Sequence, residues 1–228
     1  MTAPLPRGTV VAIDGPAGAG KSTVGRQLAA ELGLGYLDTG AMYRAVTFAV
    51  LRRGVDPNDV DAVAAVSRSI ELSVADDLVT VDGVDATVEI RGRDVTGAVS
   101  AVAANSAVRT ELVARQRSWA DKRGGGVIEG RDIGTVVFPD AALKAYVTAS
   151  PRVRAERRVA EIGGSVDEVE ASIVERDRKD SSRADSPLRA GDDAVTVDTS
   201  ELGVDAVVGV LRKTLEGRIG DRARGSER

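Results

Sequence analysis

A short stretch near the start of the chain, Gly15-Pro16-Ala17-Gly18-Ala19-Gly20-Lys21-Ser22, has the residue types and spacing of a phosphate-binding loop. Its glycines allow backbone N–H groups to approach a polyphosphate closely, where a side chain would stand in the way. In such a loop we expect Lys21 to reach the β- and γ-phosphates as a point charge, and the Ser22 hydroxyl to be a ligand of the accompanying magnesium ion. The pattern therefore predicts a protein that handles a nucleoside triphosphate with Mg²⁺.

The flanks of this loop have the structure that the loop requires. Residues 9–13, Thr-Val-Val-Ala-Ile, form a β-branched apolar run that predicts a buried strand ending at Asp14-Gly15. After the loop, apolar residues recur at helical spacing from Val24 to Leu32, and Gly33 supplies a natural C-cap. Strand, turn and helix together favour a phosphate loop over an incidental glycine-rich turn.

The composition limits the chemistry that can surround the loop. The 228 residues are 43% hydrophobic and include no cysteine and no histidine. This length suits one α/β domain with a modest insertion. Disulfides, thiolate metal sites and a histidine general base are excluded, which leaves carboxylates, arginine, lysine, hydroxyls, backbone amides and a bound metal ion. Phosphoryl transfer fits this set, because it needs positioning and charge neutralisation more than covalent participation of the protein.

Net charge and the apolar pattern bear on partners and location. The formal net charge of −4 argues against non-specific nucleic-acid binding as the main activity. Apolar runs fall short of a membrane-spanning length, and residues 1–8 lack the apolar stretch of a signal peptide. We therefore expect a cytoplasmic monomer with no membrane partner and no nucleic-acid partner.

The sequence predicts strands that alternate with helices, and these elements must position the loop. Apolar runs at 127–129, 143–147 and 194–197 predict further strands of a parallel sheet, each accompanied by helical stretches. Helices are expected around 41–53 and 204–215. The pattern predicts a three-layer α/β fold with a mostly parallel central sheet.

Residues 70–95 have a different pattern. Three short segments, at about 70–74, 79–81 and 88–90, alternate apolar with polar residues and are separated by turn signals such as Asp82-Gly83. They predict a small antiparallel β insert. We divide a single domain over residues 1–228 into a core at about 9–58, 99–150 and 190–217, an insert at about 59–98, a lid region at about 151–189, and a tail at about 218–228 that we expect to be disordered.

An arginine-rich region between Arg152 and Arg189 is the second chemical signal. Two sets in it fall on one helix face each: Arg154, Arg157 and Arg158 at i, i+3 and i+4, and Arg176, Asp180 and Arg183 at i, i+4 and i+7. For an arbitrary charged helix, a solvated surface laced with ion pairs is the plain interpretation. Downstream of a phosphate loop, the pattern favours a mobile helical lid that covers the transferring phosphate and excludes water.

The segment Glu129-Gly130-Arg131-Asp132-Ile133-Gly134-Thr135 begins at the carboxyl end of a predicted parallel strand, the edge at which ligands of open α/β sheets bind. Its arginine can present a planar donor fork to a phosphate, and its carboxylates can accept from hydroxyl or amino groups. The alternative is a helix N-cap by Asp132 beside a surface arginine.

These segments resemble the bacterial cytidylate kinase family, one branch of the nucleoside monophosphate kinases. The matching stretches are, in family order, Asp14 to Thr23 with the phosphate loop, Asp-Thr-Gly-Ala-Met-Tyr-Arg at 38–44, Gly-Arg-Asp-Ile-Gly-Thr-Val-Val-Phe-Pro-Asp at 130–140, and the run from Glu-Arg-Asp at 175 to Arg183. The insert is similar to the piece that lengthens the monophosphate-binding region in this family. The resemblance implies transfer of the γ-phosphoryl group of ATP to CMP or dCMP with Mg²⁺, in pyrimidine nucleotide metabolism.

The resemblance also implies roles on the ATP side. The positions that match ATP-binding residues are Gly15, Pro16, Ala17, Gly18, Ala19, Gly20, Lys21, Ser22 and Thr23. The lid arginines that fold over the triphosphate correspond to Arg154, Arg157 and Arg158. With Lys21 and Arg131, these three complete the set expected to act in catalysis.

For the acceptor, matching positions imply a second set of contacts. The acceptor phosphate corresponds to Arg44 and Arg131 with Thr39 and Tyr43 lining the pocket, the cytosine ring to Ser100, Arg109, Asp132 and Arg183, and the sugar hydroxyls to Arg176 and Asp180. Cytosine offers a carbonyl, a ring-nitrogen acceptor and an exocyclic amine, so it needs both donors and a carboxylate. We therefore expect CMP and dCMP to be good acceptors and UMP a poor one.

Two positions depart from the family pattern. Glu129 stands where many members have aspartate, so its carboxylate reaches one methylene further. Ala17 replaces a serine that some members use near the acceptor phosphate. Neither change removes an essential charge.

Three other functions are weighed against this interpretation. A phosphate-loop kinase of another small acceptor would share Lys21 and Ser22 but not the cytosine set. A GTPase-like switch would carry an Asn-Lys-x-Asp segment, which is missing; Arg178-Lys179-Asp180 does not qualify. An RNA-binding protein is disfavoured because only 3% of the residues are aromatic.

Overall fold

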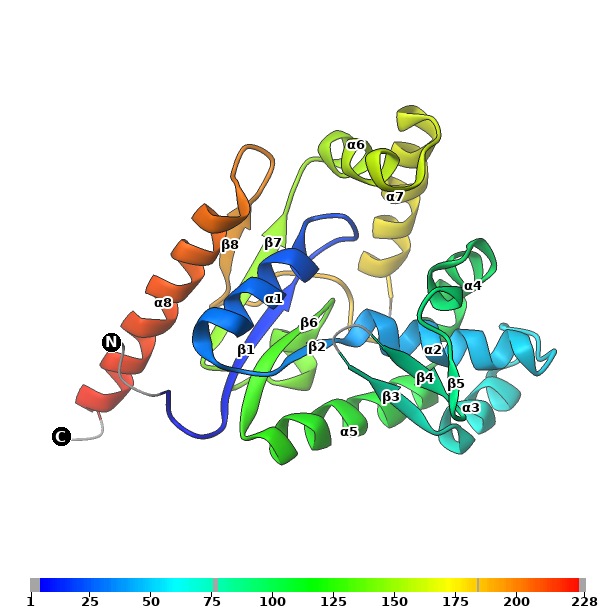
Figure 1. Cartoon of the computed structure of the whole chain (residues 1–228), viewed down its shortest axis with the longest axis horizontal. Helices are drawn as coiled ribbons and strands as arrows, with labels where there is room; N and C mark the ends of the chain where they lie inside the picture. Colours follow the sequence, from blue (N-terminus) through cyan, green and yellow to red (C-terminus); the bar gives the residue numbers. More distant parts are fainter. Residues whose placement is uncertain (1–4, 76–77, 184, 226–228) are drawn as a thin grey trace. The chain divides into compact units, whose positions relative to one another are not determined.

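The computed structural model describes residues 5–75, 78–183 and 185–225, which form two compact units (Figure 1). The core unit comprises residues 1–36 and 120–228, and the second unit comprises Leu37–Trp119. Each is described separately below.

A parallel sheet organises the core unit. Its elements are β1 (Thr9–Asp14), α1 (Lys21–Leu32), β2 (Tyr36–Asp38, which runs into the second unit), β6 (Gly125–Gly130), the π-helical turn η2 (Ile133–Val137), β7 (Leu143–Thr148), α6 (Pro151–Ile162), α7 (Val166–Ser181), β8 (Val195–Asp198) and α8 (Val204–Gly225). The strand order is β2-β6-β1-β7-β8, and the pairs that β1 makes with β6 and β7, and β7 with β8, are all parallel. The predicted α/β fold with a mostly parallel sheet is confirmed.

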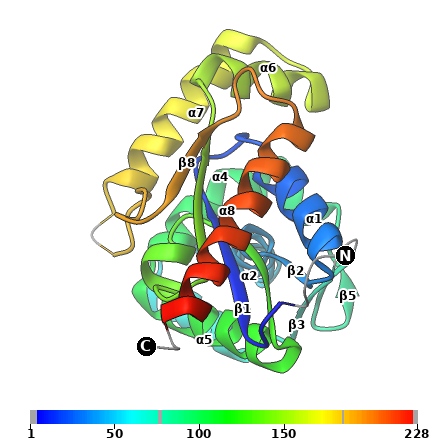
Figure 2. The same ribbon diagram turned by 90° about the vertical axis from the view of Figure 1, so that its left-hand side faces the viewer.

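The register of the central strands brings their carboxyl ends together. Asp14, the last residue of β1, lies opposite Gly130 of β6 and Tyr146 of β7. All six residues of β1 are buried, as the β-branched run predicts. Buried residues of β1, β6, β7, α1 and α8 form one apolar core, and Figure 2 shows α8 running across the strands beside α1. The core therefore fixes the edge of the sheet at which the phosphate loop emerges.

The C-terminal helix is longer than expected. Helix α8 begins at Val204 as predicted but continues to Gly225, so the expected end near 215 is too early. The prediction of a disordered tail from 218 is wrong up to Gly225, and residues 226–228 lie outside the described part. Ile219 packs against the apolar core, and the Arg218 guanidinium donates a hydrogen bond to the carbonyl of Asp193. These contacts stabilise the added turns, although the segment has few apolar residues.

The second unit combines helices with the expected antiparallel insert. Its elements are α2 (Thr39–Arg52), α3 (Val60–Ser69), β3 (Leu72–Val74), β4 (Val79–Val81), β5 (Val84–Asp85), the 3₁₀ turn η1 (Glu89–Arg91), α4 (Arg93–Ala104) and α5 (Ser106–Arg123, which extends into the core unit). Strands β3, β4 and β5 form an antiparallel sheet in that order.

The third strand of the insert lies earlier than predicted. Asp82 and Gly83 have φ angles of 51° and 75°, the conformation of a two-residue hairpin turn, so β5 begins directly at Val84. The Asp85 carboxylate then accepts hydrogen bonds from the backbone N–H and the hydroxyl of Thr87, which turns the chain out of the sheet. The segment expected as a strand at 88–90 instead runs into η1, where Ile90 is buried.

Candidate functional site

The phosphate loop lies between the buried strand β1 and helix α1, as predicted. Gly15, Gly18 and Gly20 have φ angles of 146°, 76° and 85°, which L side chains rarely adopt. A Cβ on Gly15 would lie 1.9 Å from the carbonyl oxygen of Val147, so the loop passes directly over the backbone of β7. Within the described residues no side chain caps the start of α1, whose first N–H groups and positive dipole end suit a phosphate.

Side-chain donors hold the carbonyl groups of this loop. Lys21 is buried and its Nζ donates to the carbonyl of Pro16 at 2.7 Å, so it lies across its own loop. The other three carbonyl contacts come from residues distant in sequence: Arg131 to Gly15 at 3.0 Å, Arg154 to Ala17 at 3.1 Å, and the Thr199 hydroxyl to Ala19 at 3.1 Å. The loop conformation is therefore fixed from several sides.

Ser22 contacts Glu129, which gives the longer carboxylate a partner. The Ser22 hydroxyl donates to Oε1 of Glu129 at 2.7 Å, and Glu129 is buried at the end of β6. A hydroxyl and a carboxylate beside a phosphate loop are hard oxygen ligands of the kind that Mg²⁺ prefers when phosphates complete its coordination. In the described part of the chain no cluster of three or more carboxylates is placed to bind a metal, so this pair is the set that fits magnesium.

Asp14 is a site residue whose role the sequence patterns did not reveal. Its side chain is 5% exposed and accepts hydrogen bonds from the backbone N–H groups of Ile133 and Gly134, both at 2.7 Å. Burial raises the pKa of this carboxyl from 3.8 to about 6, against the two hydrogen bonds, which lower it; nearby Asp132 adds to the rise and Lys21 opposes it. Its position as the last residue of a buried strand, at the edge of the sheet where ligands bind, was the available signal.

The raised pKa links Asp14 to stability. The Asp14 carboxyl has a pKa near 3.8 in the unfolded chain and about 6 in the folded protein. Between these two pH values the folded state keeps a proton that the unfolded state has released. The group therefore contributes stability that is fully present below pH 3.8 and is lost as the pH rises through about 6. Near neutral pH the folded protein contains a buried, ionised carboxylate.

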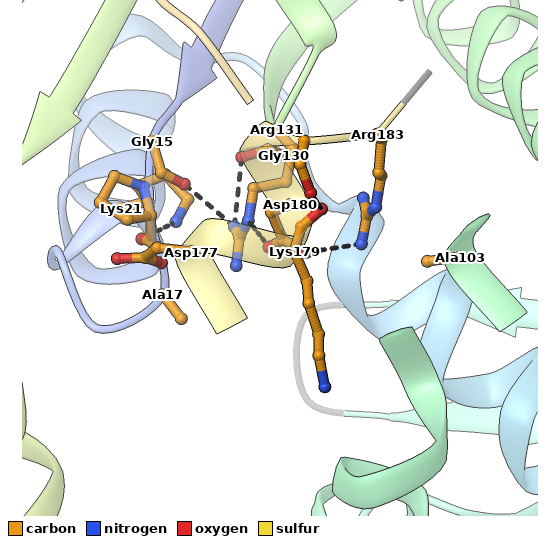
Figure 3. Close-up of polar contacts among 12 residues, drawn as sticks. Gly15, Ala17, Lys21, Ala103, Gly130, Arg131, Asp177, Lys179, Asp180 and Arg183 are labelled. Atoms are coloured by element: carbon orange, nitrogen blue, oxygen red, sulfur yellow. Dashed lines mark hydrogen bonds and ion pairs between the residues drawn. The ribbon is translucent and has the colours of Figure 1, made fainter. Parts of the chain in front are cut away.

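Arg131 and Arg183 meet on one buried carboxylate (Figure 3). Nε of Arg131 lies 3.0 Å from Oδ2 of Asp180, and Nη2 of Arg183 lies 2.5 Å from its Oδ1, while Asp180 itself is 2% exposed. Helix α7 ends at Ser181, so the prediction that Arg183 continues the helical face is wrong; the chain turns after Ser182 and still brings its guanidinium back to Asp180.

Arg176 adds a third guanidinium to this group. Burial lowers its pKa, the nearby charges of Arg131 and Arg183 lower it further, and Asp180 and Asp177 act in the opposite sense. In the part of the chain that the structure describes, its buried Nε has no hydrogen-bond partner. Asp177 is already paired with Arg154, so the three guanidinium groups around Asp180 leave an excess of positive charge, which suits an anionic ligand.

The predicted lid arginines have three different environments on α6. Arg154 is 4% exposed and, besides its bond to Ala17, donates to the carbonyl of Ala149 at 2.9 Å and pairs with Asp177 of α7 at 2.7 Å. Arg157 donates to the hydroxyl and the carbonyl of Thr199 at 3.0 and 2.6 Å. Arg154 therefore contacts the phosphate loop directly. Arg157 contacts Thr199, whose hydroxyl donates to the loop carbonyl of Ala19.

Arg158 does not join this network. Its guanidinium pairs with Glu161 at 3.0 Å on an exposed face of α6. Asp132, for which a capping role was the alternative, makes no side-chain cap to the turn that follows it; in the described chain the N–H groups at that turn are bonded by Asp14 instead.

The predicted acceptor residues of the second unit lie on its helices. Arg44 of α2 donates to the carbonyl of Ile90 at 3.0 Å and to the hydroxyl of Thr96 at 2.9 Å. Arg109 of α5 is buried, lies 5.6 Å above the ring of Tyr43 and donates to the carbonyl of Ala103 at 3.3 Å. These contacts orient Arg44, Tyr43 and Arg109 within one unit.

The two remaining predicted residues of this unit have simpler settings. Thr39 is buried at the start of α2, where the preceding Asp38 caps the helix by accepting from the N–H of Ala41. Ser100 is half-buried on α4. Across the described residues, none of the helices combines the length and the apolar character needed to cross a membrane.

Known proteins are similar to this chain over most of its length. A family model described as cytidylate kinase matches residues 11–216. The chain is 52% identical over 220 residues to a cytidylate kinase of Rhodococcus opacus, covering 92% of this chain and 96% of the relative. It is 51% identical to one of Mycobacterium avium, with the same two coverages. A gluconokinase structure from Sinorhizobium meliloti is similar with a TM-score of 0.52 at 14% identity, covering 98% of this chain and all of that one, a likeness of fold alone.

Proposed function

The chain belongs to the cytidylate kinase family, and from this premise we propose that it transfers the γ-phosphoryl group of ATP to CMP or dCMP, releasing ADP and CDP or dCDP. The observation that carries the proposal is the family match over residues 11–216, together with a phosphate loop that has the required strand, turn and helix. It is therefore a nucleoside monophosphate kinase, as the sequence resemblance implied.

On the donor side, we assign the triphosphate to the phosphate loop and the start of α1. Lys21 is assigned as the point charge for the β- and γ-phosphates, and its Nζ already lies within the loop, where it donates to the Pro16 carbonyl. Ser22 and Glu129 would hold Mg²⁺, which when bound neutralises charge on the phosphate oxygens. Arg154 and Arg157 approach the same loop from α6.

On the acceptor side, we assign the residues of each unit separately. In the core unit, Arg131, Arg176 and Arg183 supply positive charge and donors, and Asp132 supplies the acceptor for the exocyclic amine of cytosine. In the second unit, Arg44 would bind the acceptor phosphate and Arg109 and Ser100 the base, with Thr39 and Tyr43 lining the pocket. These assignments, and that of Asp180 to the sugar, stay proposals.

Catalysis then needs no general base. Phosphoryl transfer is accelerated chiefly by holding donor and acceptor in line and by neutralising charge on the transferring group. Helices α6 and α7 pack against each other and carry the arginines, so we propose residues 151–189 as the lid that excludes water. The cytoplasmic location and monomeric state stay predictions.

The first prediction concerns the acceptor. With ATP and Mg²⁺, ADP production is expected to be fast with CMP and dCMP and slow with UMP, AMP, GMP and dTMP, because cytosine alone among these bases presents a carbonyl, a ring-nitrogen acceptor and an amine in sequence along one edge. Each acceptor is compared with a reaction lacking acceptor and one containing EDTA. Preference for another monophosphate would keep the kinase and reject the cytosine pocket, whereas acceptor-independent hydrolysis would indicate a nucleotide switch.

The second prediction concerns Asp132. Asp132→Asn should reduce the ratio of kcat/KM for CMP over UMP by about tenfold or more, because an amide can donate to the carbonyl that uracil has in place of the amine. The matched control is Asp59→Asn, at the exposed N-cap of α3, where asparagine caps as well as aspartate does. An unchanged CMP to UMP ratio in the Asp132 variant would remove this residue from base recognition.

A further inference from the structure

The end of β1 holds a segment that lies more than a hundred residues further along the chain. Both oxygens of the buried Asp14 carboxylate accept hydrogen bonds, Oδ1 from the N–H of Ile133 and Oδ2 from that of Gly134, each at 2.7 Å. The next residue, Gly15, accepts from the Arg131 guanidinium at 3.0 Å. Asp14 and Gly15 therefore bind both the backbone and a side chain of the segment 131–134.

This segment is a local irregularity that the fold must support from outside. It leads into the turn η2, in which the N–H groups of Val137 and Phe138 bond to carbonyls five residues earlier, those of Asp132 and Ile133. Turns of this wide type are uncommon and are found frequently at functional sites. Asp14 bonds the N–H groups at the start of this turn, as an N-cap would, but it does so from a neighbouring strand.

We propose that Asp14 is a positioning residue for the acceptor nucleotide, because its ionised carboxylate fixes the segment that presents Arg131 and Asp132. The inference rests on the proposed function, which assigns these two residues to CMP. Lys21 and Ser22, which serve ATP, are held by the Pro16 carbonyl and by Glu129 instead. Loss of the Asp14 contacts should therefore disturb the acceptor more than the donor.

The charge of Asp14 matters for this task. An ionised carboxylate can accept from both N–H groups at once, whereas a protonated carboxyl or an amide turns a donor toward one of them. The charged and titratable groups whose fields reach Asp14 are Asp132 at the end of β6, Lys21 of α1 and Tyr146 of β7. The variant Asp14→Asn therefore mimics the protonated carboxyl of Asp14 at every pH.

The decisive experiment compares the parent with Asp14→Asn across the pH range. At pH 8, kcat/KM for CMP should fall roughly tenfold to a hundredfold, the range that corresponds to one charge-assisted hydrogen bond, mostly through a higher KM for CMP. The KM for ATP should change by less than about threefold, since no ATP contact is removed. Asp85→Asn, on the exposed hairpin of the second unit, is the matched control, because this carboxylate also accepts from a backbone N–H.

The ratio of kcat/KM for CMP in the parent to kcat/KM for CMP in Asp14→Asn is then measured as a function of pH. The phosphate of CMP itself titrates near pH 6, and taking the ratio cancels its contribution. As Asp14 becomes protonated below about pH 6, the parent should come to resemble the variant, so that the ratio approaches one at low pH and reaches a plateau above pH 7. A flat ratio, at any value, would overturn the proposal.

One further readout and one further variant distinguish a loss of positioning from misfolding of Asp14→Asn. Amide hydrogen exchange at Ile133 and Gly134 should be at least about tenfold faster in Asp14→Asn at pH 8, with strand β7 unaffected. Gly134→Ala keeps the charge but places a Cβ 3.3 Å from Oδ2 of Asp14 and 3.1 Å from Cγ of Lys144. It should raise the KM for CMP while keeping the pH dependence of the parent.

The exchange measurement separates the two proposals. If the parent fails to phosphorylate CMP, the proposed function falls, yet the exchange rates still report whether Asp14 holds the segment. If the parent is active, a variant that keeps the parental KM for CMP, or exchange rates that stay parental, overturns the role of Asp14.

Discussion

Replacing Lys21 by methionine is expected to lower kcat with CMP by about a thousandfold or more, because a fixed positive charge on the transferring phosphoryl group is worth several powers of ten in rate. Methionine keeps the length and the apolar stem of the buried side chain, so the fold should persist. Steady-state ADP production at saturating ATP, Mg²⁺ and CMP measures the effect.

The control for this prediction is Lys213→Met, which removes an exposed lysine of α8 and should leave kcat unchanged. The Lys21 variant also loses a hydrogen bond to the Pro16 carbonyl, so its thermal unfolding is recorded beside the parent. If the Lys21 variant folds and turns over within about threefold of the parent, the assignment of this loop to the triphosphate is wrong.

Gly15→Ala should be the most damaging small substitution in the loop. The added Cβ would lie 1.9 Å from the carbonyl oxygen of Val147, and a φ of 146° is one that alanine rarely adopts. Relieving this contact requires the loop and β7 to separate, at a cost of about 3 kcal/mol or more. We expect the melting temperature to fall by roughly 6–12 °C and kcat to collapse with it.

A matched glycine on α4 tests whether position or residue type is responsible. Gly97 has open space around its Cα and ordinary helical backbone, so Gly97→Ala should be neutral or stabilise the protein by up to about 1 kcal/mol. Thermal unfolding followed by circular dichroism compares the two variants with the parent. A Gly15 variant that melts within about 2 °C of the parent would mean that the loop does not press against β7 as described.

Local patterns predicted the elements around the phosphate loop well. The buried run at 9–13, the glycine spacing and the helix from Lys21 are each decided within a few residues, so β1, the loop and α1 were foreseen with nearly correct bounds. The hairpin of the insert was foreseen for the same reason, because Asp82-Gly83 is a local turn signal.

Long-range contacts account for what the patterns missed. Helix α8 extends past residue 217 because Ile219 packs against the apolar core. The local sequence pattern does not predict this long-range contact. Helical spacing placed Arg176 and Asp180 on one face but could not show that α7 stops at Ser181. The partners of Asp14 and Glu129 lie more than a hundred residues away, so only the register of the parallel strands could reveal them.

The side chains that hold the carbonyls of the phosphate loop have a consequence for nucleotide affinity. In a planar trans peptide the N–H points away from the preceding carbonyl, so engaging the carbonyls of Pro16, Ala17 and Ala19 turns the N–H groups of Ala17, Gly18 and Gly20 the opposite way. The loop therefore loses its conformational freedom when the chain folds and not when ATP arrives. Binding energy that would otherwise be spent on ordering the loop then appears as affinity for the polyphosphate.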